Sequence, residues 1–283
     1  MRPAQKFLLW IHRHRGWGWP GLLVYAALVT FPHENVQYVV NEIAVRISHK
    51  RLYQASAAIA LGEGAILTLI FWLALRKQAA WRTIAVYWVL TIALIFGTWR
   101  LLTANNVELV HYPQYVPEGV ALMALTLSPV ESLAWVTIFG GLDECYQYWD
   151  LMGGRPVQYD FNDIYMDLLG GAAGVLLAMV FLRCEPARVE WRAVLRRPGI
   201  ATLIGIVAAG VVLVASGWVR LYQDKTAHYW FALSRDKPPE YWFINPMFGP
   251  HRFHTLSPVE GPVLILATIG VYALLARAVR VKE

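Results

Sequence analysis

The sequence is poor in charge and in cysteine. Asp, Glu, Lys and Arg make up only 16% of the 283 residues, against about a quarter in soluble globular chains, and 57% of the residues are hydrophobic. The two cysteines, Cys145 and Cys184, have no metal-type spacing. We find no glycine-rich phosphate loop, no Ser-His-Asp arrangement, no haem-type cysteine motif and no strong internal repeat. These absences point away from the common soluble enzyme classes and favour a membrane protein.

Long apolar runs support that interpretation. A transmembrane helix needs about 20 mostly apolar residues. The first run resembles a signal peptide, but no small-x-small cleavage site follows it, so we treat it as an uncleaved helix. We expect an all-α, polytopic transmembrane bundle of about eight helices, at residues 17–31, 52–75, 83–101, 115–127, 132–149, 161–182, 200–219 and 262–276.

Basic residues give the expected orientation, because cytoplasmic loops are enriched in Lys and Arg. They gather at the amino terminus, at residues 76–82, at residues 183–197 and in the tail after 276. With eight helices all four groups fall on one side, so we expect both termini to be cytoplasmic. The two cysteines then lie on opposite sides, which makes a disulfide between them implausible. We attribute the net charge of +6 to the basic residues of the cytoplasmic loops and termini, and we do not take it as a sign of nucleic-acid binding.

Two segments on the opposite, outer side differ from ordinary loops. Between Asn35 and Gln54, apolar residues recur at helical spacing with charged residues between them, which predicts an amphipathic helix on the outer surface. The segment from Arg220 to Ser257 is rich in Trp, Tyr and Phe. Aromatic residues prefer the membrane–water boundary, so we expect this segment to cap the outer face of the bundle.

Acidic residues gather near the outer ends of the middle helices. Asp160, Asp163 and Asp167 are three and four residues apart, which predicts one shared helical face. Asp143 and Gln147 share a face of the preceding helix, and Glu144 is turned about 100° away. Close to them in the expected topology are His111, Glu118 and the two basic residues Arg100 and Arg155. Ionisable residues within a membrane are costly and usually have a function, so we take this acidic cluster as the candidate site.

The same stretch carries a resemblance to a known family. His111-Tyr112-Pro113-Gln114-Tyr115 followed by Gly119 resembles the histidine-led helix start of the VanZ-like membrane family. Asp143-Glu144-x-x-Gln147, Arg155, Asp160-x-x-Asp163 and Gly170-Gly171-x-x-Gly174 resemble its signature. Asp167 departs from the pattern, because the family usually has Asn there. The resemblance implies a bacterial cytoplasmic (inner) membrane protein of the cell envelope, in a family named for glycopeptide antibiotic resistance.

The resemblance also suggests a division of the chain. Residues 84–182 would form a VanZ-like four-helix domain. Residues 1–83 would form an N-terminal helix pair with the amphipathic helix, and residues 183–283 a C-terminal helix pair with the aromatic loop.

Our first functional interpretation is that the cluster recognises or modifies a lipid-linked or phosphorylated head group at the outer leaflet, with membrane lipids or a lipid-linked glycan as partner. Carboxylates bind divalent cations such as Mg²⁺, and the metal ligands would be Asp143, Asp163 and Asp167. Proton transfer and catalysis would fall to His111, Glu118, Asp143 and Glu144. Substrate binding would fall to Arg100, Gln147, Arg155 and Asp160.

Two other interpretations remain open. The acids, Arg155 and His111 could form a buried network that only holds the helices together, in a scaffold or accessory subunit with membrane-protein partners. Glu63, in the middle of the second predicted helix between Gly62 and Gly64, could be a proton carrier in a flippase or transporter, or a neutral side chain hydrogen-bonded to a neighbouring helix.

Overall fold

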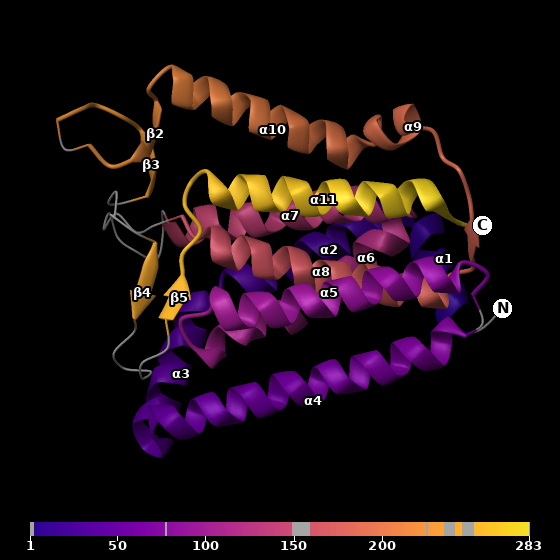
Figure 1. The fold of residues 1–283 in the computed structure, drawn as a ribbon, viewed down its shortest axis with the longest axis horizontal. Helices are drawn as coiled ribbons and strands as arrows, with labels where there is room; N and C mark the ends of the chain where they lie inside the picture. The colour runs from indigo at the N-terminus through magenta and orange to yellow at the C-terminus, as the bar shows by residue number, and fades with distance from the viewer. Residues whose placement is uncertain are drawn as a thin grey trace.

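The computed structural model describes residues 3–76, 78–148, 159–224, 226–234, 241–244 and 252–282. The helices lie roughly side by side in one bundle (Figure 1). Their bounds are α1 (Pro3–Arg13), α2 (Arg15–Thr30), α3 (His33–Ile47), α4 (His49–Leu75), α5 (Trp81–Leu101), the 3₁₀ turn η1 (Asn106–Val110), α6 (His111–Thr126), α7 (Pro129–Tyr146), α8 (Phe161–Phe181), α9 (Trp191–Leu195), α10 (Pro198–Ala215) and α11 (Glu260–Ala278).

A helix occupies most of each of the eight predicted segments within the described residues, although α10 ends at Ala215 and not at residue 219. Five of the helices are long and apolar enough to cross a membrane: α4, α5, α8, α10 and α11. The other three fall short for physical reasons. Helices α2 and α6 have only 16 residues each, and α7 contains three acidic residues. The protein is therefore mostly helical with five candidate spans, and the finer count of eight stays a prediction.

Helix α8 is the centre of the bundle and is almost entirely buried. It packs against α6 with the two backbones in contact, which glycine makes possible. A Cβ atom at Gly119 would lie 2.1 Å from the carbonyl oxygen of Gly171, and one at Gly174 would lie 2.1 Å from that of Val116. A Cβ at Gly170 would likewise lie 2.4 Å from the carbonyl oxygen of Tyr112, so Gly170 and Gly174, four residues apart, both allow α6 to approach α8 closely.

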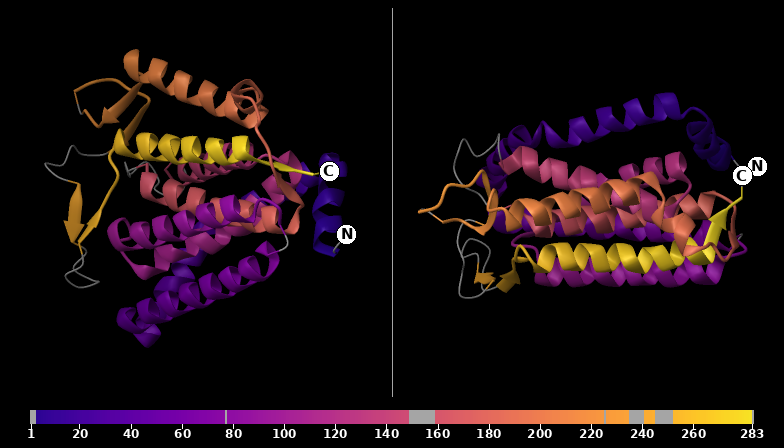
Figure 2. Two further views of the ribbon diagram at one scale, coloured as in Figure 1. Left: turned by 45° about the vertical axis from the view of Figure 1, so that its right-hand side comes forward. Right: turned by 90° about the horizontal axis from the view of Figure 1, so that it is seen from above.

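Peripheral helices surround this centre. Helices α4 and α10 lie on opposite flanks (Figure 1), and α2 covers a third flank (Figure 2, right). Most of the side chains of α4 and α10 are exposed, which suits helices that face lipid.

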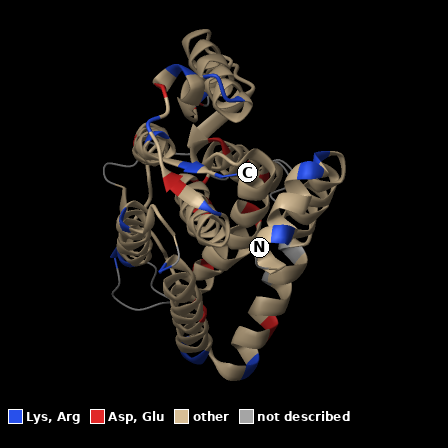
Figure 3. Ribbon diagram, turned by 90° about the vertical axis from the view of Figure 1, so that its right-hand side faces the viewer, with Lys and Arg blue, Asp and Glu red and all other residues tan. Residues whose placement is uncertain are grey.

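Both termini lie at one end of the bundle (Figure 1), and many Lys and Arg residues are at this basic end (Figure 3). Here β1 (Cys184–Pro186) pairs antiparallel with β6 (Val279–Val281). Both cysteines are free. The common placement of the termini agrees with the sequence analysis, and the assignment of this end to the cytoplasm stays a prediction.

The opposite end, which we call the acidic end, holds the two unusual segments. Helix α3 lies across it and leaves most of its apolar side chains exposed, but it ends at Ile47. The prediction that it continues to Gln54 is wrong, because Ser48 has a φ of 80° and residues from His49 onward belong to α4. In the aromatic segment, β2 (Val219–Tyr222) pairs with β3 (Phe231–Ser234), and β4 (Trp242–Ile244) pairs with β5 (Arg252–His254).

Candidate functional site

A cavity of about 520 Å³ opens at the acidic end. It lies among the end of α3, the start of α4, η1 and the acidic ends of the central helices. We call it the acidic cavity. None of the described lining residues is Lys or Arg. The lining residues whose side chains can form hydrogen bonds are Asn41, His49, Tyr53, Asn105, Glu108, His111, Gln147, Asp160, Asn162, Asp163 and Thr255.

His111 joins α6 to α8. It is the first residue of α6 and is buried. Its Nδ1 lies 2.9 Å from Oδ1 of Asp167, and its Nε2 lies 3.6 Å from Oδ2 of Asp163. Asp163 and Asp167 therefore share a face of α8, as their spacing predicted. The pair holds the imidazole at the inner wall of the acidic cavity, with Asp167 fully buried behind it.

The third aspartate of the predicted face has a different position. Asp160 is the N-cap of α8, and its Oδ1 accepts a hydrogen bond of 2.8 Å from the backbone N–H of Asn162. Its own N–H donates to Oε2 of Glu144 at 3.1 Å. The prediction of one face for all three is therefore wrong for Asp160, because a capping residue lies outside the helical backbone.

Gln147 bridges the acids of α7. Its Nε2 donates to Oδ2 of Asp143 at 3.1 Å and to Oε1 of Glu144 at 3.0 Å. The prediction that Asp143 and Gln147 share one face is confirmed. Glu144 is linked to both Gln147 and Asp160, so it connects the end of α7 to the start of α8.

Below the acidic cavity, three buried carboxyl groups from three helices approach one another. Glu118 of α6 interacts electrostatically with Asp167 and Asp143. In each of the three, one oxygen is buried without a hydrogen-bond partner among the described residues: Oε1 of Glu118, Oδ1 of Asp143 and Oδ2 of Asp167. Gly140 leaves the space for Asp167, because a Cβ there would lie 3.0 Å from Oδ2.

Asn162 holds the rim of the site together. Its Nδ2 donates to the carbonyl oxygens of Leu102 and His254, both at 2.9 Å. Its Oδ1 accepts from the N–H of Leu256 at 2.8 Å. One buried amide thus fixes α8, the end of α5 and the segment that follows β5.

Glu108 was missed by the sequence reasoning. It lies in η1, where no helical periodicity marks it, three residues before His111. Its two oxygens accept from the backbone N–H of Ala104 at 2.8 Å and from Nδ2 of Asn105 at 2.7 Å. Burial, reinforced by the nearby Asp163, raises the pKa of Glu108 to about 8. Burial and Asp163 likewise raise the pKa of Asp160 to about 7.

The two expected counter-charges are not seen in the cluster. Arg100 is exposed near the end of α5, and no ion pair joins it to these carboxylates among the described residues. Arg155 lies outside the described residues.

The metal prediction also lacks support. In the part of the chain that the structure describes, no group of three or more His, Cys, Asp or Glu side chains is placed to hold a metal ion. Asp143 is turned to Gln147 while Asp163 faces His111, so these two do not converge with Asp167 on one point.

Glu63 lines a second, separate space. A groove of about 110 Å³ runs between α4, α5, α6 and α8, and its other lining residues are apolar or aromatic apart from glycine and proline. Towards the basic end the groove is closed, because Phe71 of α4 stacks on Trp88 of α5 with ring centroids 4.0 Å apart. This packing disfavours a water path from Glu63 to the basic end.

No family model, curated protein or solved structure matches this chain. The fold and the site define a helical membrane protein with a buried, histidine-containing acidic cluster at one end, and the VanZ-like resemblance stays a prediction.

Proposed function

We propose that the acidic cavity binds the head group of a membrane lipid, and that this head group carries an amine in its ammonium form. The observation that carries the proposal is the lining of the cavity. Glu108, Asp160 and Asp163 converge on it, and no Lys or Arg joins them among the described lining residues. A cation with several N–H donors complements such a lining in both charge and hydrogen bonding.

The number of carboxyl groups strengthens the argument. Seven lie in and under the cavity: Glu108, Glu118, Asp143, Glu144, Asp160, Asp163 and Asp167. Among these seven, Asp163 and Asp167 pair with the imidazole of His111. Buried like charges resist ionisation unless positive charge lies close to them, so this crowding favours carboxyl groups that hold protons, bind a cation, or do both.

Of the head groups that the sequence suggested, this geometry favours one that is lipid-linked and amine-bearing over a bare phosphate. A phosphate would need a metal ion or an arginine inside the cavity. The imidazole of His111, fixed by Asp167, is the group placed to exchange a proton with the amine if the protein also modifies its ligand.

Ethanolamine, the smallest such head group, provides the test. Its binding to the purified protein in detergent would be measured by titration calorimetry. We expect Glu108→Gln and Asp163→Asn each to weaken binding at least tenfold at pH 8 while the melting temperature changes little. Glu42→Gln is the matched control, because Glu42 is a partly exposed acid of α3 paired with Arg46. If the wild type does not bind ethanolamine, or if the folded variants bind it as well as the wild type does, the proposal is wrong.

A structural network is the second candidate, and the bonds between Glu144, Asp160 and Gln147 favour it. It makes the opposite prediction: Asp143→Asn and Asp163→Asn would both lower the yield of folded protein, and ethanolamine would bind to neither the wild type nor the variants.

A further inference from the structure

The groove beside Glu63 lies below the acidic cavity, towards the middle of the bundle. On α5, residues 88, 92, 95 and 99 line the groove, and Leu102, the C-cap of α5, lines the cavity; the spacing of four, three, four and three marks one continuous face. On α4, His49, Leu52 and Tyr53 line the cavity, and residues 60, 63, 64 and 67 line the groove on the same face. The two spaces therefore lie on the same helix faces, one below the other.

The connection between α5 and α6 contributes to both spaces in alternation. Glu108 and His111 line the cavity, whereas Leu109 and Tyr112 line the groove. A ligand that extends from the cavity along these faces would pass directly from carboxylates to apolar side chains. Such an abrupt change of polarity matches the junction between a lipid head group and its hydrocarbon chain.

The groove fits a chain better than it fits a protein partner. A helix with its side chains is about 10–12 Å across, and a space of about 110 Å³ does not admit one unless α4 moves. Glu63 is the one charged residue among the described groove-lining residues, so the occupant has to be predominantly apolar.

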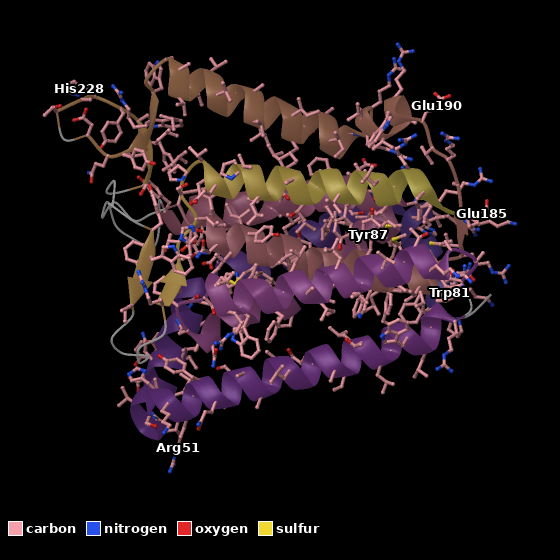
Figure 4. All side chains as sticks on the ribbon, viewed as in Figure 1. Arg51, Trp81, Tyr87, Glu185, Glu190 and His228 are labelled. Atoms are coloured by element: carbon pink, nitrogen blue, oxygen red, sulfur yellow. The ribbon has the colours of Figure 1, made fainter. Side chains whose placement is uncertain are left out.

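Two basic residues lie at the same end of α4 but outside the lining of both spaces. Lys50 and Arg51 fall between His49 and Leu52 at the start of α4, and both are exposed. Figure 4 shows Arg51 at the acidic end of α4, with Trp81 and Glu185 at the basic end. At about 100° per residue, Arg51 is turned away from the face that His49, Leu52 and Tyr53 present to the cavity, so the carboxylates of the cavity stay open to a cation from the ligand.

We infer that the ligand is an ethanolamine-type phospholipid, with its ammonium in the acidic cavity and part of one acyl chain in the groove between α4 and α5. This inference rests on the proposed head-group binding and adds the acyl chain and a lateral route between α4 and α5. Leu67 and Trp88 line the end of the groove nearest the basic end, so the chain passes Glu63 on its way there.

Two glycines of α4, one on each side of Glu63, provide a matched pair of variants. Gly64 lines the groove and Gly62 does not, yet a Cβ added at either would meet no atom within 4 Å. Both variants are therefore expected to fold. Gly64→Trp would fill the groove, and Gly62→Trp would place the same bulk on another face of the helix.

The experiment uses the full chain in vesicles of phosphatidylethanolamine and phosphatidylglycerol. A small fraction of the phosphatidylethanolamine carries a photoreactive diazirine in mid-chain, and labelled residues are identified by mass spectrometry. We expect labelling of Ile92, Ile95 and Val116 in the wild type and in Gly62→Trp, and a reduction of at least fivefold in Gly64→Trp. The reference is Val86, an exposed residue of α5 outside the groove, whose labelling should be the same in all three proteins.

Equal labelling of the groove in Gly64→Trp and Gly62→Trp would overturn the inference. The inference would also be overturned if the groove residues carried no lipid label, whether they stayed unlabelled or were covered by a second copy of the chain. Ethanolamine titration of the wild type separates this failure from that of the proposed function. If ethanolamine binds and the groove is unlabelled, only the chain position is wrong. If ethanolamine does not bind, the head-group proposal fails and this inference fails with it.

Discussion

The affinity for ethanolamine should rise steeply with pH, and Glu108 should be the main cause. In the free cavity, burial and Asp163 hold the pKa of Glu108 at about 8, with Asp160 also raising it and His111 opposing. An ammonium ion next to the carboxylate favours the ionised form. Binding therefore requires a proton to leave Glu108, and that loss becomes easier as the pH rises.

The size of the effect follows from the ionised fraction. A carboxyl group with a pKa of about 8 is about 1% ionised at pH 6 and about half ionised at pH 8, so binding that needs the carboxylate strengthens about 50-fold over this range. Asp160, with a pKa of about 7, goes from about 10% to about 90% ionised and adds a factor of up to about nine.

The raised pKa of Glu108 makes the ligand-free protein less stable as the pH rises, whereas it makes ligand binding stronger. The unfolded chain ionises Glu108 near its ordinary pKa of about 4.5, whereas the folded chain keeps the proton to about pH 8. Over this window the unfolded state binds fewer protons, so the folded state loses stability as the pH rises. Ethanolamine should consequently raise the melting temperature more at pH 8 than at pH 6.

Titration calorimetry at pH 6, 7 and 8, in buffers of different ionisation enthalpy, measures both the affinity and the number of protons released. Glu108→Gln should bind more weakly at pH 8 and should keep only the smaller, roughly ninefold dependence that belongs to Asp160. An affinity that stays flat or falls between pH 6 and 8 would refute the reasoning, because it would mean that ionised carboxylates do not bind the ligand.

Two further predictions concern the framework of the site. Gly174→Ala places a Cβ 2.1 Å from the carbonyl oxygen of Val116 and must separate α6 from α8. We therefore expect the free energy of unfolding to fall by about 1–3 kcal/mol and the melting temperature to fall with it. Gly205→Ala is the control and should have little effect, because a Cβ there meets no atom within 4 Å. Asn162→Leu removes three hydrogen bonds worth about 1 kcal/mol each, and hydrogen exchange should become faster in residues 252–257; unchanged exchange there would show that Asn162 does not hold this segment.

Helical periodicity predicted the parts of the site that lie within regular helices. The spacing of Asp163 and Asp167 predicted one shared face, and the structure turns that face towards His111. The spacing of Asp143 and Gln147 also predicted a shared face, on which the two side chains form a hydrogen bond. The partner of α8 could not be predicted from its glycines, although glycines make the close contact with α6 possible, because only residues without a side chain allow backbones so close.

Positions outside regular helices could not be predicted in this way. Glu108 lies in a short 3₁₀ turn and Asp160 is a cap, so neither follows the period of a helix. Arg100 was expected in the site because it is near the right end of α5. Its neighbour Trp99 faces the groove, so Arg100 is turned about 100° from that face and its side chain is exposed.

Three of the side-chain amides around the cavity have a consequence for the selectivity between head groups. Nε2 of Gln147 donates to two carboxylates, Nδ2 of Asn162 donates to two carbonyl oxygens, and Nδ2 of Asn105 donates to Glu108. These N–H groups are directed at the protein itself, while the carboxylates can only accept. A primary ammonium brings three donors to such a wall, and a trimethylammonium group brings none. The cavity would thus distinguish ethanolamine from choline by the direction of hydrogen bonding, even though both carry the same charge.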